Sequence, residues 1–256
     1  MTPKISFQNV SKRFDLAGRS SFAALDNFSL DIDDGEFITV VGPSGCGKST
    51  AMNIAAGLTA PSSGRVVVDD VEVDKPSPER GVIFQQYALF PWLTVRENVE
   101  FGLQIAGLAK AERRKIADHF IGLVGLTDFA NALPKTLSGG MKQRCAIARA
   151  YAVNPKMLLM DEPFGALDAL TRVQLQEQLL TMWSKERRTV MFITHDVDEA
   201  VFLASRVIVM AARPGRLHKI IPIELPYPRN EEIRLSPEFA ALRNQVWRAV
   251  YHPTSE

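Results

Sequence analysis

The sequence has little of what would place the chain in an oxidising compartment or inside a membrane. Its 256 residues include two cysteines, Cys46 and Cys145, which match neither a metal-binding pattern nor a disulfide framework. The first residues, MTPKISFQNV, lack the apolar core of a signal peptide. No stretch approaches the roughly 20 apolar residues of a spanning helix. We therefore expect a cytoplasmic chain that acts at a membrane, if at all, through a partner.

An excess of one charge is also missing. Thirty Lys and Arg residues face 29 Asp and Glu residues, so the formal net charge is +1. Nucleic-acid binding rests largely on positive charge, so this balance argues against a nucleic-acid partner. The hydrophobic content of 46% is typical of a soluble globular protein of about one to two domains.

Short apolar runs alternate with helical patterns along most of the chain. Runs such as FITVV, MLLM and VMFI predict strands buried on both faces, and strand–helix alternation predicts a parallel α/β sheet. The segment from about 87 to 153 is mostly helical in its periodicity, which predicts a helical insertion. After about Arg213 the chain is proline-rich, and it regains a helical pattern at PEFAALRNQVWRAV.

A glycine-rich stretch, GPSGCGKST, follows the FITVV run directly and precedes a helical pattern. Its spacing is that of a phosphate-binding P-loop, in which glycines let backbone amides turn toward an anion. Lys48 suits the β- and γ-phosphates, and Ser49 suits a Mg²⁺ ion. This motif alone does not separate kinases, GTPases, helicases and transport ATPases.

Polar residues stand at the ends of three further predicted strands. In KMLLMDEP, Asp161 and Glu162 follow the apolar run MLLM. Asp161 is a candidate ligand for Mg²⁺, and Glu162 is a candidate for polarising an attacking water. In FITHD, His195 lies at the end of the predicted strand, where its imidazole could contact a γ-phosphate oxygen or the attacking water. Gln85 ends GVIFQ and suits Mg²⁺ or water, with Gln86 as the alternative.

The stretch LSGGMKQR, from Leu137 to Arg144, resembles the signature of the ATP-binding subunits of ATP-binding-cassette (ABC) transporters. DEPFGALD and ITHDVDEA resemble further motifs of that family, in the same order. The resemblance runs from about residue 4 to residue 229. It implies an α/β fold with a P-loop NTPase (RecA-like) core, an antiparallel β subdomain and the helical insertion. On this basis we expect an ABC ATPase domain at 1–230 and a helical tail at 231–256.

The resemblance also assigns roles to residues. Ser138, Gly139 and Gly140 would bind the γ-phosphate of a nucleotide held by a second copy of the chain, Asp168 would lie at the dimer contact, and Phe14 would stack on adenine. Lys48, Glu162 and His195 are the expected catalytic residues, and Ser49, Gln85 and Asp161 the expected metal ligands. The expected nucleotide-binding set is Phe14, Gly42, Pro43, Ser44, Gly45, Cys46, Gly47, Lys48, Ser49, Thr50, Gln85, Ser138, Gly139, Gly140 and Asp168.

The mechanism that this resemblance implies is a head-to-tail dimer closed by two ATP molecules with Mg²⁺ and reopened by hydrolysis. The chain would lie on the cytoplasmic face of the cell membrane, bound to a separate permease that a solute-binding protein supplies. FQQYALFPWLTVRENV, DEPFGALDALTR and the tail look most like the importers of nitrate, sulfonates and taurine. Importers of pyrimidine or thiamine precursors are the alternative, and a soluble ABC ATPase without a transport role is another.

Overall fold

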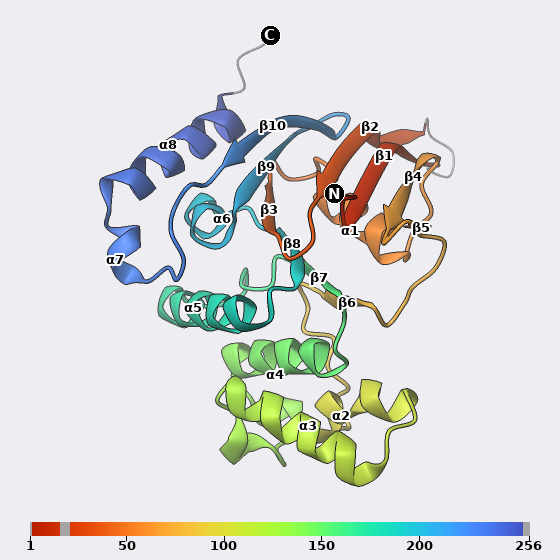
Figure 1. Cartoon of the computed structure of the whole chain (residues 1–256), viewed down its shortest axis with the longest axis vertical. Coiled ribbons are helices and arrows are strands. Elements are labelled where there is room, and N and C mark those ends of the chain that lie inside the picture. The colour runs from red at the N-terminus through yellow and green to blue at the C-terminus, as the bar shows by residue number, and fades with distance from the viewer. Residues whose placement is uncertain (1, 16–20, 253–256) are drawn as a thin grey trace. The chain divides into compact units, whose positions relative to one another are not determined.

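The structure is a computed structural model that describes residues 2–15 and 21–252. The chain forms two compact units (Figure 1). The first contains residues 1–77 and 180–256, and the second contains residues 78–179. Helix α5 (Ala169–Glu186) passes from the second unit into the first.

An antiparallel sheet forms one part of the first unit. Its order is β2 (Phe22–Ile32), β1 (Ile5–Phe14), β4 (Ser63–Val68) and β5 (Val71–Glu72). The turn from β4 to β5 consists of Asp69 and Asp70, which both have positive φ, as the tight turns of hairpins require. Phe7 and Phe28 meet edge to face at 5.3 Å between ring centroids, which anchors β1 on β2.

Parallel strands form the other part of the first unit. Strand β3 (Phe37–Val41) lies between β8 (Thr189–Ile193) and β9 (Arg206–Ala211), and β10 (Arg216–Pro222) adds an antiparallel edge to β9. Every residue of β3 and β8 is buried, because both faces of these strands are covered.

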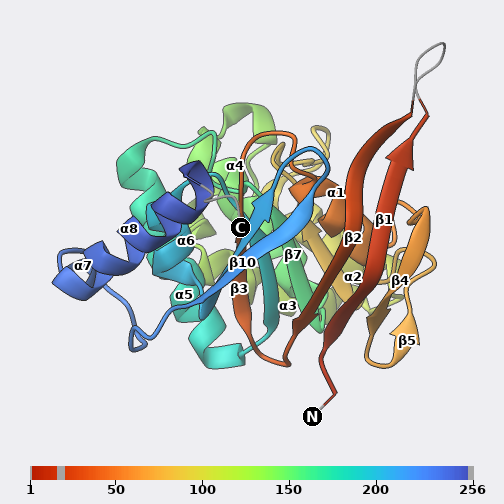
Figure 2. The same cartoon turned by 90° about the horizontal axis from the view of Figure 1, so that it is seen from above.

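The helices of the first unit lie around these strands. They are α1 (Lys48–Ala56), α6 (Val197–Leu203), α7 (Glu231–Arg234) and α8 (Pro237–Tyr251). Helix α6 packs on β3, and α8 packs on α6 and β9. Figure 2 shows α6 and α8 on one side of the parallel strands and the antiparallel sheet on the other.

A buried arginine, Arg229, connects the segment just before the tail to helix α6. The guanidinium of Arg229 donates hydrogen bonds of 2.8–2.9 Å to the carbonyls of Val201, Phe202 and Ala204 at the C-terminal end of α6. It also lies 4.1 Å from the ring centroid of Tyr227. A guanidinium at a helix C-terminus donates hydrogen bonds to carbonyls that have no partner within the helix. Its positive charge also interacts favourably with the negative end of the helix dipole.

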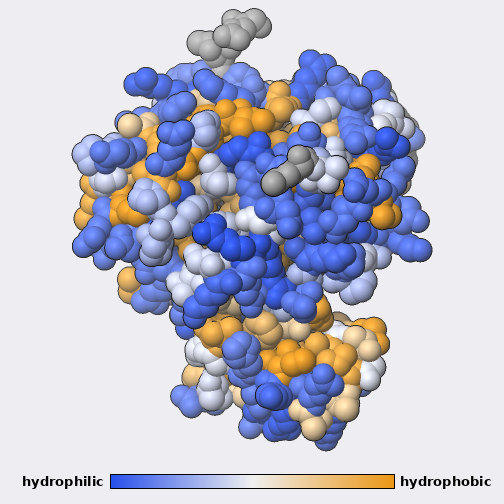
Figure 3. Space-filling view, viewed as in Figure 1, coloured by the Kyte–Doolittle hydropathy of each residue, from blue (hydrophilic) through white to orange (hydrophobic). Residues whose placement is uncertain are grey.

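The second unit contains two parallel strands and a helical bundle. Strand β6 (Arg80–Ile83) pairs with β7 (Met157–Asp161). The helices are α2 (Val95–Ile105), α3 (Lys110–Leu123) and α4 (Gly139–Ala152), with short 3-10 turns η1 (Thr127–Phe129) and η2 (Pro134–Thr136). Figure 3 shows apolar surface gathered over this helical part.

The α/β fold class expected from the sequence is confirmed, and the predicted helical segments form α2, α3 and α4. One strand went unpredicted. The proline-rich segment after Arg213 forms β10, and the pairing of β10 with β9 shifts by one residue between Leu217 and Lys219. This β-bulge at His218 interrupts the alternation by which a strand is recognised in a sequence.

Candidate nucleotide site

The glycine-rich loop leaves the C-terminal end of β3 and enters α1 directly. A Cβ atom on Gly42 would lie 2.5 Å from the Met210 carbonyl oxygen and 2.8 Å from the Cys46 sulfur. Gly47 has φ +91°, and a Cβ there would lie 2.6 Å from the Ala24 carbonyl oxygen. Both positions therefore require glycine, for close backbone approach and, at Gly47, also for the left-handed conformation.

The start of α1 has the properties of an anion site. Gly47 is the N-cap residue and supplies no side-chain hydrogen bond to the first turn. The amides of that turn therefore remain available to an anion, which the helix dipole also favours. The Lys48 ammonium donates hydrogen bonds to the carbonyls of Gly42 (2.8 Å) and Pro43 (3.2 Å), so it lies across the loop itself.

Cys46 lies beneath this loop rather than on its surface. Its side chain is fully buried, and its sulfur is 3.8 Å from the Lys48 ammonium. Burial raises the pKa of the Cys46 thiol, against the opposing effect of Lys48. The thiol is therefore a packing group and not a nucleophile.

His195 is held at the same edge of the sheet as the loop. In the parallel pairing of β3 and β8, Val40 stands opposite Ile193, and the Thr194 amide donates to the Val40 carbonyl at 3.2 Å. Gly42 and His195 each follow that pair by two residues. The structure thus brings together two of the sequence-predicted elements, and the His195 side chain is exposed at that edge.

Phe14 is connected to the loop through β2. It pairs with Phe22 at the end of β1, and Ala24, two residues further along β2, has its carbonyl against Gly47. The Phe14 ring is 41% exposed, and the Lys12 ammonium lies 5.0 Å from its centroid. An exposed ring at this position is available for stacking on a flat ligand.

In the second unit, Gln85 and Glu162 occupy equivalent places after paired strands. Ile83 pairs with Met160 in the parallel register of β6 and β7, and each of the two polar residues follows two positions later. Asp161 is the last residue of β7 and is partly buried. Glu162 has φ +42°, a left-handed conformation that costs a non-glycine residue about 1–2 kcal/mol. Such strain is typical of functional positions.

The LSGG segment begins α4. Ser138 is its N-cap, and the Ser138 hydroxyl accepts a hydrogen bond of 3.3 Å from the Met141 amide. A Cβ atom added to Gly139 would lie 3.0 Å from the Tyr87 hydroxyl oxygen. A Cβ atom added to Gly140 would lie 2.7 Å from Cγ2 of Thr171. The segment therefore approaches α5 too closely for a side chain at position 140.

Asp168 caps the helix that Gly140 contacts. Its carboxylate accepts a 3.0 Å hydrogen bond from the Thr171 amide. That hydrogen bond lowers the pKa of the Asp168 carboxyl. The side chain is exposed, so the cap leaves its other oxygen open to solvent or to a second chain.

Two residues near these elements were not singled out from the sequence. Arg149 of α4 donates to the carbonyls of Ala88 (2.7 Å) and Tyr87 (3.2 Å), just after Gln85, and burial lowers the pKa of its guanidinium. Gln143 of α4 is fully buried, and neither polar atom of its side-chain amide has a hydrogen-bond partner among the described residues. Arg149 stands between two alanines, and this local sequence does not indicate that its side chain contacts the loop after Gln85. Gln143 lies within the LSGGMKQR stretch, but its burial could not be predicted from that stretch.

Ser49 and Asp161, two of the residues proposed from the sequence for Mg²⁺, carry oxygen groups of the kind that Mg²⁺ prefers. Within residues 2–15 and 21–252, no group of three or more His, Cys, Asp or Glu side chains forms a site for a metal ion. Mg²⁺ bound to phosphates uses only one or two carboxylates or hydroxyls of the protein. The exposed Ser49 in the first turn of α1 and Asp161 at the end of β7 are suitable groups.

A loop of this geometry between a buried parallel strand and a helix defines a P-loop nucleotide-binding protein. Residues 25–165 match the family model described as ABC transporter, and the chain belongs to that family. It is an ATPase of the ATP-binding-cassette class. Among the described residues, none of the helices combines the length and apolar character of a membrane span.

Sequence similarity to known proteins extends over most of the chain. A Brucella abortus protein named as an ATP-binding protein is 74% identical, over 98% of this chain and 95% of its own. The nitrate import ATP-binding protein of a Synechocystis species is 47% identical, over 89% and 88%. The taurine import ATP-binding protein of Roseobacter denitrificans is 44% identical, over 98% and 96%. A dimeric ATP-binding cassette in a post-hydrolysis state, solved with ADP and Pi, is 35% identical with a TM-score of 0.77, over 87% of this chain and 100% of that one.

Proposed function

We propose that the chain is the ATP-hydrolysing subunit of an importer for a small anionic solute of the nitrate, taurine or sulfonate type. The observation that carries this proposal is the sequence identity of 44–47% to nitrate and taurine import proteins, over most of both chains. The chain would work as a dimer on the cytoplasmic face of the membrane, bound to a separate permease. Residues 1–230 would form the ATPase domain and residues 231–256 a tail.

We propose the following roles for residues of the two units. The amides of the loop and Lys48 bind the phosphates, and Phe14 stacks on the base. Ser49, Asp161 and Gln85 would hold Mg²⁺, which would supply charge neutralisation on the phosphates when bound. His195 contacts the γ-phosphate or the attacking water. Ser138, Gly139 and Gly140 bind the nucleotide of a second copy, at a helix N-terminus suited to an anion.

Glu162 acts as the base or water-orienting group. Because its left-handed backbone is fixed by the 3.1 Å hydrogen bond from the Gly165 amide to the Glu162 carbonyl, its carboxylate is directed by the turn rather than by β7. General-base assistance of this kind contributes about 10²–10⁴-fold to a rate.

The test is reconstitution from native membranes. A tagged Glu162→Gln chain with ATP and Mg²⁺ should retain a multi-span permease after gentle solubilisation, whereas Lys48→Ala should not. The wild-type complex in liposomes should then couple ATP hydrolysis to uptake of labelled taurine, nitrate or an alkanesulfonate. Uptake of a pyrimidine or thiamine precursor instead would contradict the solute class and support the alternative. Recovery of soluble proteins alone would contradict the importer role while leaving the ATPase intact.

A further inference from the structure

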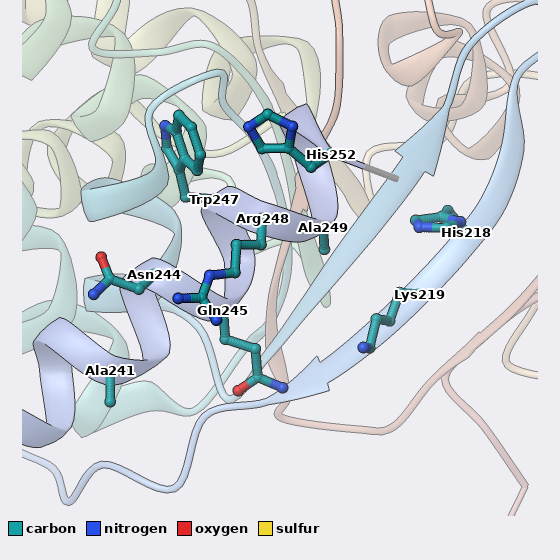
Figure 4. Close-up of a pocket in the computed structure, with 9 residues that line it drawn as sticks. All are labelled: His218, Lys219, Ala241, Asn244, Gln245, Trp247, Arg248, Ala249 and His252. Atoms are coloured by element: carbon teal, nitrogen blue, oxygen red, sulfur yellow. The ribbon is translucent and has the colours of Figure 1, made fainter. Parts of the chain in front are cut away.

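A hollow of about 890 Å³ lies in the first unit, between β10 and α8, and none of the described residues that line it belongs to the glycine-rich loop. Figure 4 shows that two of the residues that line it come from β10, and the others from α8 and its C-terminal cap. Its volume is within the range of about 300–1,000 Å³ typical of small-molecule sites. Its lining residues are His218, Lys219, Ala241, Asn244, Gln245, Trp247, Arg248, Ala249 and His252.

The charge of this hollow has one sign. Lys219 and Arg248 carry positive charges, His218 and His252 add basic nitrogens, and no carboxylate is found among the described residues that line the hollow. Within residues 2–15 and 21–252, the side chains of Lys219 and Arg248 take part in no ion pair or hydrogen bond. Two unneutralised cations facing one cavity attract an anion.

The β-bulge in β10 accounts for the position of two of these groups. Consecutive residues of a regular strand point to opposite faces, so His218 and Lys219 would normally diverge. The extra residue at His218 removes that alternation, and both residues line the same hollow. Bulges are often found where a strand must redirect a side chain toward a ligand.

The hollow also has an aromatic wall. Trp247 is 46% exposed, and its ring centroid lies 5.1 Å from that of Tyr251 and 5.2 Å from that of His252. The amides of Asn244 and Gln245 add hydrogen-bonding groups. The C-terminal end of α8 carries a partial negative charge, which Arg248 in the last turn of the helix offsets.

We propose that this hollow binds a small organic anion, with its sulfonate, phosphate or carboxylate on Lys219 and Arg248 and its flat apolar part against Trp247. An inorganic oxyanion is far smaller than the cavity and would leave the indole unused. This hollow would bind its ligand without the residues proposed for the nucleotide, and that ligand need not be the transported solute.

The test is calorimetric titration of the full chain with the nucleotide site filled by ADP and Mg²⁺. p-Toluenesulfonate and phenyl phosphate are the anionic probes, and neutral p-toluenesulfonamide is the matched control ligand. We expect saturable anion binding that weakens as NaCl is raised, because salt screens these exposed charges. The sulfonamide should bind about ten-fold or more weakly, since it lacks a charge-assisted hydrogen bond. Tighter binding of one probe distinguishes a sulfonate from a phosphate ligand.

Variants locate the site. Lys219→Gln combined with Arg248→Gln should weaken binding of the tighter probe by about ten-fold or more. Arg243→Gln changes another exposed arginine of α8 outside the hollow and should leave the affinity within about two-fold. All three side chains are exposed, so the variants should fold, and circular dichroism checks this. The proposal is wrong if neither anion binds saturably, if the sulfonamide binds equally well, or if Arg243→Gln weakens binding as much as the double variant.

Discussion

Two glycines of the phosphate loop offer a matched pair of substitutions. Gly45 has φ +76°, and a Cβ there would have no heavy atom within 4 Å. Gly47 has φ +91°, and its Cβ would lie 2.6 Å from the Ala24 carbonyl oxygen and 2.7 Å from Cδ2 of Leu25. Both changes to alanine impose a left-handed residue, but only the second also forces a collision with backbone.

The magnitudes follow from that difference. Gly45→Ala should lower the free energy of unfolding by about 1–2 kcal/mol, the cost of the left-handed conformation. Gly47→Ala should lower it by about 2–5 kcal/mol, because displacement of β2 adds an overpacking cost. The gain from a less flexible unfolded chain is the same for both variants and cancels in the comparison.

Urea denaturation of the nucleotide-free variants measures these changes, since each midpoint shift multiplied by a common slope gives the difference in stability. Binding of a fluorescent ATP analogue provides a second readout, in which Gly47→Ala should lose affinity because β2 and the start of α1 are displaced. Equal destabilisation by the two changes would refute the close approach of Gly47 to β2 on which the loop geometry depends.

Three further predictions concern residues with distinct physical roles. Glu162→Gln should bind ATP like the wild type and lose about 10²-fold or more in turnover, measured by phosphate release; wild-type turnover would remove Glu162 from its role. Arg149→Gln should lower turnover by about ten-fold with little change in ATP affinity, because it leaves the carbonyls of Tyr87 and Ala88, just after Gln85, without their hydrogen-bond donor. Partial rescue by Arg149→Lys would show that the positive charge positions this loop. Unchanged turnover in Arg149→Gln would contradict the role of Arg149. Burial raises the pKa of the Cys145 thiol to about 12, above the ordinary 9.0, so the stability that this group contributes is present below pH 9 and is lost as the pH rises toward 12. From pH 8 to pH 10 the wild type should therefore lose about 1.4 kcal/mol more than Cys145→Ala in urea titrations, and parallel losses would contradict this.

The sequence predicts the elements of this molecule better than the contacts between them. Local patterns of apolar residues, glycines and caps mark the loop, the strand that ends in Asp161, the strand that ends two residues before His195, and the helix after Ser138. The strand order is not, because the partners of β3 in the sheet lie about 150 residues further along the chain. β10 was missed because its bulge breaks the alternation of side chains.

Side-chain partnerships were equally hidden from the sequence. Arg149 looks like any basic residue of an amphipathic helix, and its role depends on where the loop after Gln85 comes to lie. The requirement for glycine at position 140 is similar, since it is set by Thr171 in another helix. Such constraints arise from tertiary packing, which local pattern does not encode.

The loop and ring proposed to hold the phosphates and base of a chain's own nucleotide, and the residue proposed to act as the base, lie in different units. The groups proposed to hold the nucleotide, the loop amides, Lys48 and Phe14, belong to the first unit, whereas Glu162 and the Ser138 segment belong to the second. Changes to Glu162 or Arg149 should therefore act on turnover and leave nucleotide affinity nearly intact, while a change at Gly47 should act on affinity first. A variant that removes only a transition-state interaction lowers kcat without raising KM, so the two classes are distinguishable by steady-state kinetics. If a Glu162 variant lost ATP affinity as severely as a Gly47 variant, this division of roles between the units would be wrong.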